Sequence, residues 1–192
     1  MRLASALTTI ALIAGTTACG GSGFPAISPV EARHLHSYDI SSTAMENTLR
    51  PGDVIAANDS VKVQRGSIIV FVGPPSWQDS PGGHGHLTFV KRVIAVGGDH
   101  IVCCDPSGRL VLNGHPLAEP YLYPGVKASD EPFDVMVPIG RLYLLGDNRP
   151  MSADSRVHQR DHDGTIPVSD VVGVVTRILK PPGRAGRVPT HT

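Results

Sequence analysis

Short apolar runs bounded by turn-forming residues recur along this chain and limit what it can fold into. Two of these runs, Val54–Ala57 and Ile68–Val72, directly follow the turn sequences Arg50–Asp53 and Gln64–Ser67. Pro, Gly, Asp and Ser in such turns favour the backbone conformations that reverse a chain. No segment shows a sustained helical period of apolar residues. The pattern therefore predicts a mostly β fold with a twisted antiparallel β-sheet core.

The length of 192 residues suits one well-cored domain with a small insertion. Asn113–Gly114 follows an apolar run and predicts a hairpin, because both residues tolerate positive φ. The stretch 73–85 is rich in Pro, Gly and Ser, which predicts an exposed loop. Val135–Leu145 and Val171–Leu179 are the expected closing strands. The expected units are a β core over 34–97 and 134–180, an inserted β lobe over 98–133 and a frayed tail over 181–192.

The N-terminal segment has the layout of an export signal. A basic start is followed by the apolar run 3–18, which is shorter than the ~20 residues that a spanning helix needs. Thr16–Cys19 looks like a lipoprotein processing site, with Cys19 as the lipidated residue and 19–33 as a flexible spacer. A cleaved signal over 1–18 and a weak uncleaved anchor are the alternatives. All three place the remaining chain outside the cytoplasm, and the lipid-anchored or N-terminally anchored forms lie at the extracytoplasmic face of a bacterial cell membrane.

Composition and spacing disfavour nucleic-acid and metal partners. Lys and Arg number 17, as do Asp and Glu, so no broad basic field is available to neutralise phosphates. His84 and His86, or His158 and His162, could share a metal ion, but no third ligand has suitable spacing, so solvated loop histidines are favoured.

The adjacent cysteines Cys103 and Cys104 would point to opposite faces of a strand. A disulfide between neighbouring residues also departs from the usual disulfide geometry. We therefore expect two packing cysteines rather than a disulfide at this point in the chain.

The residues suited to catalysis fall into separated blocks. These are Ser42–Asp53, Phe89–Asp99 and Gly146–Arg156, with a fourth block, Arg65–Phe71, between the first two. In this order and at these separations they resemble the type I signal peptidases. That family has Ser-Met-x-Pro-Thr-Leu, then a Lys-Arg strand ending in Gly-Asp, then Gly-Asp-Asn-Arg followed by Ser-x-Asp-Ser-Arg. Four blocks in register make the match specific. It implies a serine endopeptidase scaffold acting on signal peptides of exported proteins, without a metal or organic cofactor.

The resemblance implies a serine–lysine dyad, in which a neutral lysine takes the proton of the attacking hydroxyl. Lys91 matches that general base. Strand alternation places Lys91 on one face with Phe89, Val93 and Ala95. Arg92 points the other way. An apolar surround disfavours the ammonium form, so we expect a lowered pKa for Lys91. A solvated lysine on an edge strand is the alternative for an arbitrary sequence.

The third block carries further residues that the resemblance assigns to the site. Ser152 matches a serine that orients the dyad lysine, and Asp154 with Arg156 matches an ion pair that holds the loops of the site. Asp147 and Asn148 match the start of the same loop. A solvated polar turn is the alternative for these two residues taken singly.

The first block departs from the family pattern at the nucleophile. Aligning Met45 with the family's methionine puts Ala44 on the nucleophile position and Ser42 on the oxyanion-hole serine. Alanine has no hydroxyl and cannot form an acyl-enzyme. On an extended strand Thr43 faces the opposite side, and Ser42 is displaced by roughly 6.6 Å along the strand. We therefore expect little or no dyad catalysis.

Two functions follow from these residues. One is a signal peptidase-like serine endopeptidase that cuts exported precursors at the membrane surface, which the retained Lys91 and Ser152 favour. The other is a non-catalytic pseudoenzyme that binds extended peptides by strand addition, which Ala44 favours. A self-cleaving repressor with a Ser–Lys β fold is disfavoured by the export signal and the absence of a helix-turn-helix segment.

Overall fold

The computed structural model describes residues 33–77 and 87–189. Within these ranges the chain forms β-strands and short 3-10 helices but no α-helix, and every strand pairing is antiparallel. The predicted mostly β fold class is confirmed. The expected export signal, Cys19, nearly all of the spacer and the pair His84 and His86 lie outside the described residues. No helix in the described part of the chain is both long enough and apolar enough to cross a membrane.

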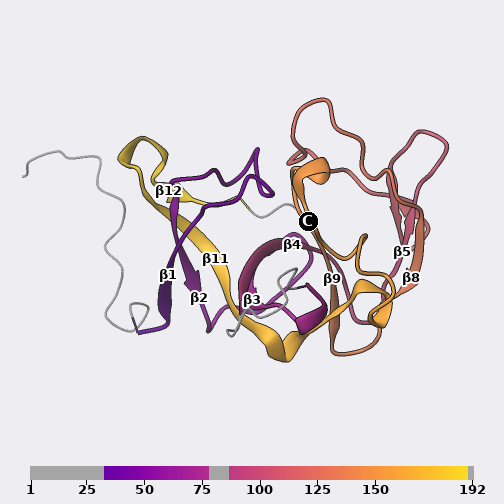
Figure 1. The fold of residues 1–192 in the computed structure, drawn as a ribbon, viewed down its shortest axis with the longest axis horizontal. Coiled ribbons are helices and arrows are strands. Elements are labelled where there is room, and N and C mark those ends of the chain that lie inside the picture. The colour runs from indigo at the N-terminus through magenta and orange to yellow at the C-terminus, as the bar shows by residue number, and fades with distance from the viewer. Residues whose placement is uncertain (1–32, 78–86, 190–192) are drawn as a thin grey trace, which may run out of the picture.

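The larger sheet has eight strands, in the order β1-β2-β11-β3-β4-β9-β10, with β12 pairing to β11. In Figure 1, β1, β2 and β11 lie on one side of the molecule and β9 lies toward the other. The strand bounds are β1 Leu35–Asp39, β2 Val54–Asn58, β3 Ile68–Val72, β4 Thr88–Val96, β9 Arg141–Leu145, β10 Ile166–Pro167, β11 Val171–Lys180 and β12 Gly186–Arg187.

The smaller sheet has four strands, in the order β7-β6-β5-β8. Its strands are β5 His100–Cys103, β6 Leu110–Leu112, β7 His115–Pro116 and β8 Phe133–Met136. β5 and β8 stand on the side of the molecule opposite β1 (Figure 1). The single closing strand expected over 135–145 is wrong. The chain turns between Val137 and Arg141, and Gly140 in this turn has a φ of +80°. β8 therefore joins the smaller sheet, and β9 joins the larger one.

Three groups of buried apolar side chains form the core of the described chain. The first joins the two sheets and includes Ile94, Ile101, Phe133 and Tyr143. The second covers one face of β2, β3 and β11 and includes Met45, Leu49, Ile55, Val70 and Val175. The third covers the other face and includes Ile69, Phe71, Trp77, Val93 and Leu142. The residues that follow β1 are therefore anchored in the core by Met45 and Leu49.

β4 contains an irregularity that changes which side chains share a face. Its pairing with β9 shifts register between Val93 and Ala95. Phe89 and Val93 both pack in the third core group, whereas Ile94 and Ala95 both pack in the first. The predicted alternation therefore extends through Val93 and fails at Ala95, because a bulge resets the direction of the following side chains.

The segment after Pro181 is folded as far as the structure describes it, so the frayed tail is wrong for residues 181–189. β12 pairs with β11, and Val188 packs in the second core group. Arg184 forms an ion pair with the buried Asp53 at 2.8 Å. The 3-10 helices are η1 Pro75–Trp77, η2 Arg149–Met151, η3 His162–Gly164, η4 Val168–Asp170 and η5 Pro182–Arg184.

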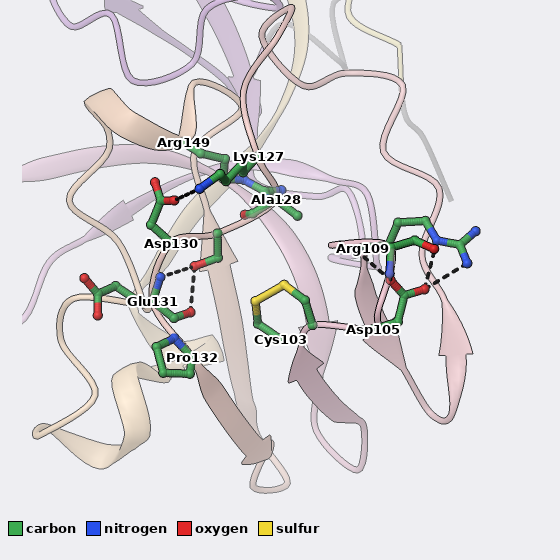
Figure 2. Close-up of a disulfide and its surroundings, with 12 residues drawn as sticks. Cys103, Asp105, Arg109, Lys127, Ala128, Asp130, Glu131, Pro132 and Arg149 are labelled. Atoms are coloured by element: carbon green, nitrogen blue, oxygen red, sulfur yellow. Dashed lines mark hydrogen bonds and ion pairs between the residues drawn. A yellow bond between two sulfur atoms is a disulfide. The ribbon is translucent and has the colours of Figure 1, made fainter.

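Cys103 and Cys104 form a disulfide, contrary to the expectation of two packing cysteines. β5 ends at Cys103, so the strand alternation behind that expectation does not continue to Cys104. Figure 2 shows the disulfide between the Asp105–Arg109 ion pair and the segment 127–132, and these segments line one cavity.

Candidate functional site

A groove lies between the turn that follows β1 and the first half of β4. The residues that line it are Asp39, Ile40, Ser41, Ser42, Ala44, Met45, Thr88, Phe89, Val90 and Lys91. The turn and the strand are separated in sequence by β2 and β3 and are brought together by the larger sheet. Ala44 and Lys91, which the motif blocks placed at the two positions of a dyad, therefore line the same groove.

Lys91 is a buried amine in the middle of β4, opposite Ile69 of β3. The residue is only 5% exposed. Burial lowers the pKa of Lys91 to about 8, because desolvation disfavours the charged form. Asp154 and Asp147 oppose this shift, and Arg156 adds to it. No hydrogen bond or ion pair within residues 33–77 and 87–189 includes the Lys91 amine. Such an amine is suited to act as a base or nucleophile near neutral pH.

The turn that carries Ala44 is held by its own backbone and by the core. The Ile40 amide donates to the Asp53 carbonyl at 2.8 Å, and the Gly52 amide donates to Ile40 at 2.8 Å. The Ala44 amide donates to the Ser42 hydroxyl at 3.1 Å. Ala44 is buried, with 4% of its surface exposed. Its methyl group thus occupies a defined position in the groove, with the Ser42 hydroxyl next to it.

The loop 146–156 packs directly behind Ala44. Gly146 has no room for a side chain, because a Cβ atom there would overlap the Ser152 side chain and the Ala44 carbonyl oxygen. Ser152 therefore lies next to the backbone of Ala44. The Ser152 hydroxyl is buried and has no hydrogen-bond partner within the described chain. It is a polar group without a hydrogen-bond partner among the described residues, on the loop that packs behind Ala44.

Asp154 and Arg156 form a buried ion pair in the same loop. The Arg156 Nε and Nη2 atoms donate to the two Asp154 carboxylate oxygens, each at 2.8 Å. Asp154 also accepts a hydrogen bond from the Gly146 amide at 3.0 Å, and Arg156 donates to the Arg149 carbonyl at 2.7 Å. The pair thus fixes both ends of the segment that contacts Ala44.

A second buried ion pair, which sequence reasoning missed, links β4 to this loop. The Arg92 Nε and Nη2 atoms donate to the Asp147 carboxylate at 2.8 and 2.7 Å, and neither side chain is appreciably exposed. The Thr48 hydroxyl also donates to Asp147. The idea that Asp147 belongs to a solvated turn is therefore wrong. Alternation in β4 indicated only that Arg92 and Lys91 face opposite ways; no sequence signal identified the partner.

The segment between β7 and β8 reaches the site through Glu119 and Tyr121. Glu119 forms a buried ion pair with Arg149, and Arg149 also donates to the Gly146 carbonyl at 2.9 Å. The Tyr121 hydroxyl donates to Glu119 at 3.0 Å, and the Tyr121 ring lies 4.0 Å from the Arg92 Cζ atom. This segment thus supports the loop 146–156 from behind. Sequence reasoning gave these residues no role.

The structure gives the remaining predicted residues different surroundings. Met45 packs in the core beneath the groove. Asn148 contacts the turn directly, since its side-chain amide donates to the Thr43 carbonyl at 3.2 Å. His158 is half-buried and stacks on Trp77 with 4.6 Å between ring centroids, so it is not a solvated loop histidine. No cluster of three metal-ligating side chains occurs among the described residues.

The family profile for signal peptidase, peptidase S26, matches residues 26–179 of the chain. The probable signal peptidase I of Mycobacterium leprae is 36% identical in an alignment that covers 79% of this chain and 70% of that protein. Signal peptidase I of Mycobacterium tuberculosis is 37% identical, covering 79% of this chain and 67% of that protein.

Two further comparisons give weaker matches. The probable thylakoidal processing peptidase 2 of Arabidopsis thaliana is 32% identical, over 79% of this chain and 40% of that protein. A crystal structure of a signal peptidase I from Enterococcus faecalis aligns with a TM-score of 0.44 and 28% identity, over 60% of this chain and 98% of that one.

Proposed function

Since this chain belongs to the signal peptidase family, peptidase S26, we propose that it binds extended signal-peptide segments in the groove without cleaving them through a serine–lysine dyad. The observation that carries this proposal is the pairing of Ala44 with Lys91 in one groove. Burial lowers the pKa of Lys91, which suits a general base, but the position in the groove that the family resemblance assigns to the nucleophile has only a methyl group. Loss of the nucleophile lowers the turnover of another serine protease roughly a millionfold.

Neighbouring hydroxyls are poorly placed to replace the missing one. The Ser42 hydroxyl accepts a hydrogen bond from the Ala44 amide, and its Cα lies two residues before the nucleophile position. The backbone of Thr43 is fixed, because its carbonyl oxygen accepts a hydrogen bond from the Asn148 side-chain amide at 3.2 Å. Since misplacing a reacting group by about 1 Å can lower a rate a hundredfold, neither residue offers ordinary dyad chemistry.

The edge of the larger sheet supports peptide binding by strand addition. β1 is the terminal strand in the sheet order, and it leads directly into the groove-lining residues Asp39–Ser42. The outer backbone edge of β1, which pairs with no other described strand, can hydrogen-bond an extended peptide, and pockets along the groove can then accept alternate side chains. Because several relatives are named signal peptidase I, signal peptides of exported proteins are the proposed class of ligand.

A second candidate function is cleavage of signal peptides by this chain as a serine endopeptidase. It is favoured by the lysine pKa of about 8 and by the buried Asp154–Arg156 pair, which a binding protein has no evident need for. Under this alternative the hydroxyl of another residue would have to reach the carbonyl carbon of the peptide, because Ala44 has none. The two candidates share the groove and differ only in turnover.

We propose that the folded part of the chain works at the extracytoplasmic face of the bacterial cell membrane. The apolar run 3–18 and Cys19 support an N-terminal or lipid anchor there. Incorporation of a labelled fatty acid in a lipoprotein-competent host, and its loss in Cys19→Ser, tests the lipid form of this anchor.

The central experiment compares the natural chain with Ala44→Ser on a signal-peptide substrate. We expect no cleavage by the natural chain and measurable cleavage by Ala44→Ser, with signal-peptide affinity similar in both. The double variant Ala44→Ser with Lys91→Met is the control and should be inactive. Equal cleavage by the natural chain and Ala44→Ser would favour the endopeptidase alternative. Absence of peptide binding in both would remove the binding proposal.

A further inference from the structure

The groove contains a primary amine for which the proposed function has no use. Lys91 lines the groove beside Ala44 and is 5% exposed. Hydrogen bonds and ion pairs in the described part of the chain leave its Nζ atom unengaged. Where a serine hydroxyl would accept a hydrogen bond from this amine, Ala44 presents only carbon. The lone pair of a neutral amine at this position therefore has no hydrogen-bond donor among the described residues and is available to a ligand in the groove.

We propose that Lys91 is itself a nucleophile and that the groove captures aldehydes, peptide aldehydes above all, as imines on its amine. The peptide part of this inference rests on the proposed function, because it places the peptide in the same groove. The aldehyde carbon would lie where a signal-peptide carbonyl would lie, between the Ala44 methyl group and the lysine.

The reaction balances without any redox partner. The Lys91 nitrogen forms a bond to the aldehyde carbon, and the proton that the nitrogen loses is taken up by the former carbonyl oxygen. The resulting hydroxyl takes up the second proton of the nitrogen and leaves as water, so the carbon–oxygen bond breaks as the carbon–nitrogen double bond forms. One water is released for each imine, and hydrolysis reverses the capture. An amine dehydrated by apolar neighbours is the form of lysine that performs this chemistry in proteins.

The groove around Lys91 favours imine formation at this amine over reaction at other groups of the protein. Phe89, Val90 and Met45 give the groove apolar walls. Lys91 is the one amine among the described residues that line it. The hydroxyl of Ser42 lies nearby, but it is an exposed side chain already bonded to the Ala44 amide.

The chain provides its own controls, because it contains three other lysines. Lys62, Lys127 and Lys180 are all exposed. At pH 7 the ordinary lysine pKa of 10.5 corresponds to an almost wholly charged amine, whereas a pKa of about 8 leaves roughly a tenth of Lys91 neutral. The neutral fraction thus differs by roughly two orders of magnitude, enough to outweigh the lower intrinsic reactivity of a weaker base.

The test is reductive labelling of the full-length chain at pH 7. A short peptide aldehyde ending in alanine, and separately propanal, are added with sodium cyanoborohydride, which reduces the imine to a stable secondary amine. Peptide mapping by mass spectrometry then gives the labelling rate of each lysine. We expect Lys91 to be labelled at least about tenfold faster than each exposed lysine, and faster by the peptide aldehyde than by propanal.

Two variants test whether the adduct forms on Lys91, and labelling of the unsubstituted chain can by itself contradict the inference. Lys91→Met should remove the fast adduct, and the matched variant Lys62→Met should keep it. Labelling of Lys91 no faster than that of the exposed lysines, with either aldehyde, would overturn the inference even if no variant folds. Selective labelling by propanal with no advantage for the peptide aldehyde would support the nucleophile and count against the peptide groove.

Discussion

The backbone amide of Asn148 donates a hydrogen bond to the carbonyl oxygen of Ala44, with 3.0 Å between the two atoms. The Asn148 side chain adds a bond to the Thr43 carbonyl at 3.2 Å. The loop 146–156 therefore holds the main chain on either side of the nucleophile position. Because that support acts on backbone atoms, it does not depend on the side chain at position 44. The absent hydroxyl is thus a local chemical change within an intact backbone arrangement.

Burial of Lys91 should make the folded chain less stable at neutral pH. Its pKa falls from the ordinary 10.5 to about 8 on folding, so between these values the unfolded chain binds more protons and stability rises with pH. Below pH 8 the full penalty applies, roughly 3 kcal/mol. We expect Lys91→Met to raise the free energy of unfolding by up to that amount at pH 7, and by less near pH 10. Urea unfolding at both pH values measures this.

The matched control for that measurement is Lys127→Met, since the Lys127 side chain is 78% exposed. It should leave the unfolding free energy nearly unchanged at either pH. A gain from Lys91→Met that is the same at pH 7 and pH 10 would contradict a buried, titrating amine.

The same lysine should set the pH dependence of Ala44→Ser. Its proton must leave before the amine can act as a base, so kcat/KM should rise with pH and level off above about 8. Between pH 6 and pH 8 we expect an increase of roughly 50-fold, measured with a substrate that has no group titrating in this range. A flat profile would show that Lys91 is not the base.

Removing the charge of Asp147 should be strongly destabilising. Arg92 is fully buried and would lose its carboxylate partner, which typically costs about 3–5 kcal/mol. We expect Asp147→Asn, which keeps the side-chain shape, to lower the urea midpoint sharply. Asp130→Asn breaks the exposed pair with Lys127 and should have little measurable effect. Similar losses in the two variants would refute a special role for the buried pair.

A methyl group at residue 146 should disturb the site without removing any polar contact. In Gly146→Ala the new Cβ would overlap the Ser152 side chain and the Ala44 carbonyl oxygen. We expect a loss of roughly 1–3 kcal/mol and, in the Ala44→Ser background, a lower rate of cleavage. Gly183→Ala is the control, because a Cβ there meets no atom within 4 Å. Full activity of the double variant Ala44→Ser with Gly146→Ala would mean that the loop 146–156 can move away from residue 44.

Several features of this protein follow from its amino-acid sequence by itself, because they are local or covalent. The alternation and turn residues around Ile68–Val72 indicated strands, since burial on one face needs only a period of two. The spacing of the motif blocks indicated the family. The absence of a hydroxyl at Ala44 needs no coordinates at all. The burial of Lys91 was also anticipated, because its strand neighbours Phe89 and Val93 are apolar.

Tertiary structure alone decided which distant groups meet. Arg92 with Asp147, and Arg149 with Glu119, are buried pairs between segments whose approach depends on the order of strands in both sheets. The turn at Gly140, the Cys103–Cys104 disulfide and the packed Val188 likewise depart from the local pattern. The physical reason is that the alternation of side chains along a strand determines which face of the sheet a residue occupies. The residue that it contacts on that face is determined by long-range packing and by the need to satisfy each buried charge.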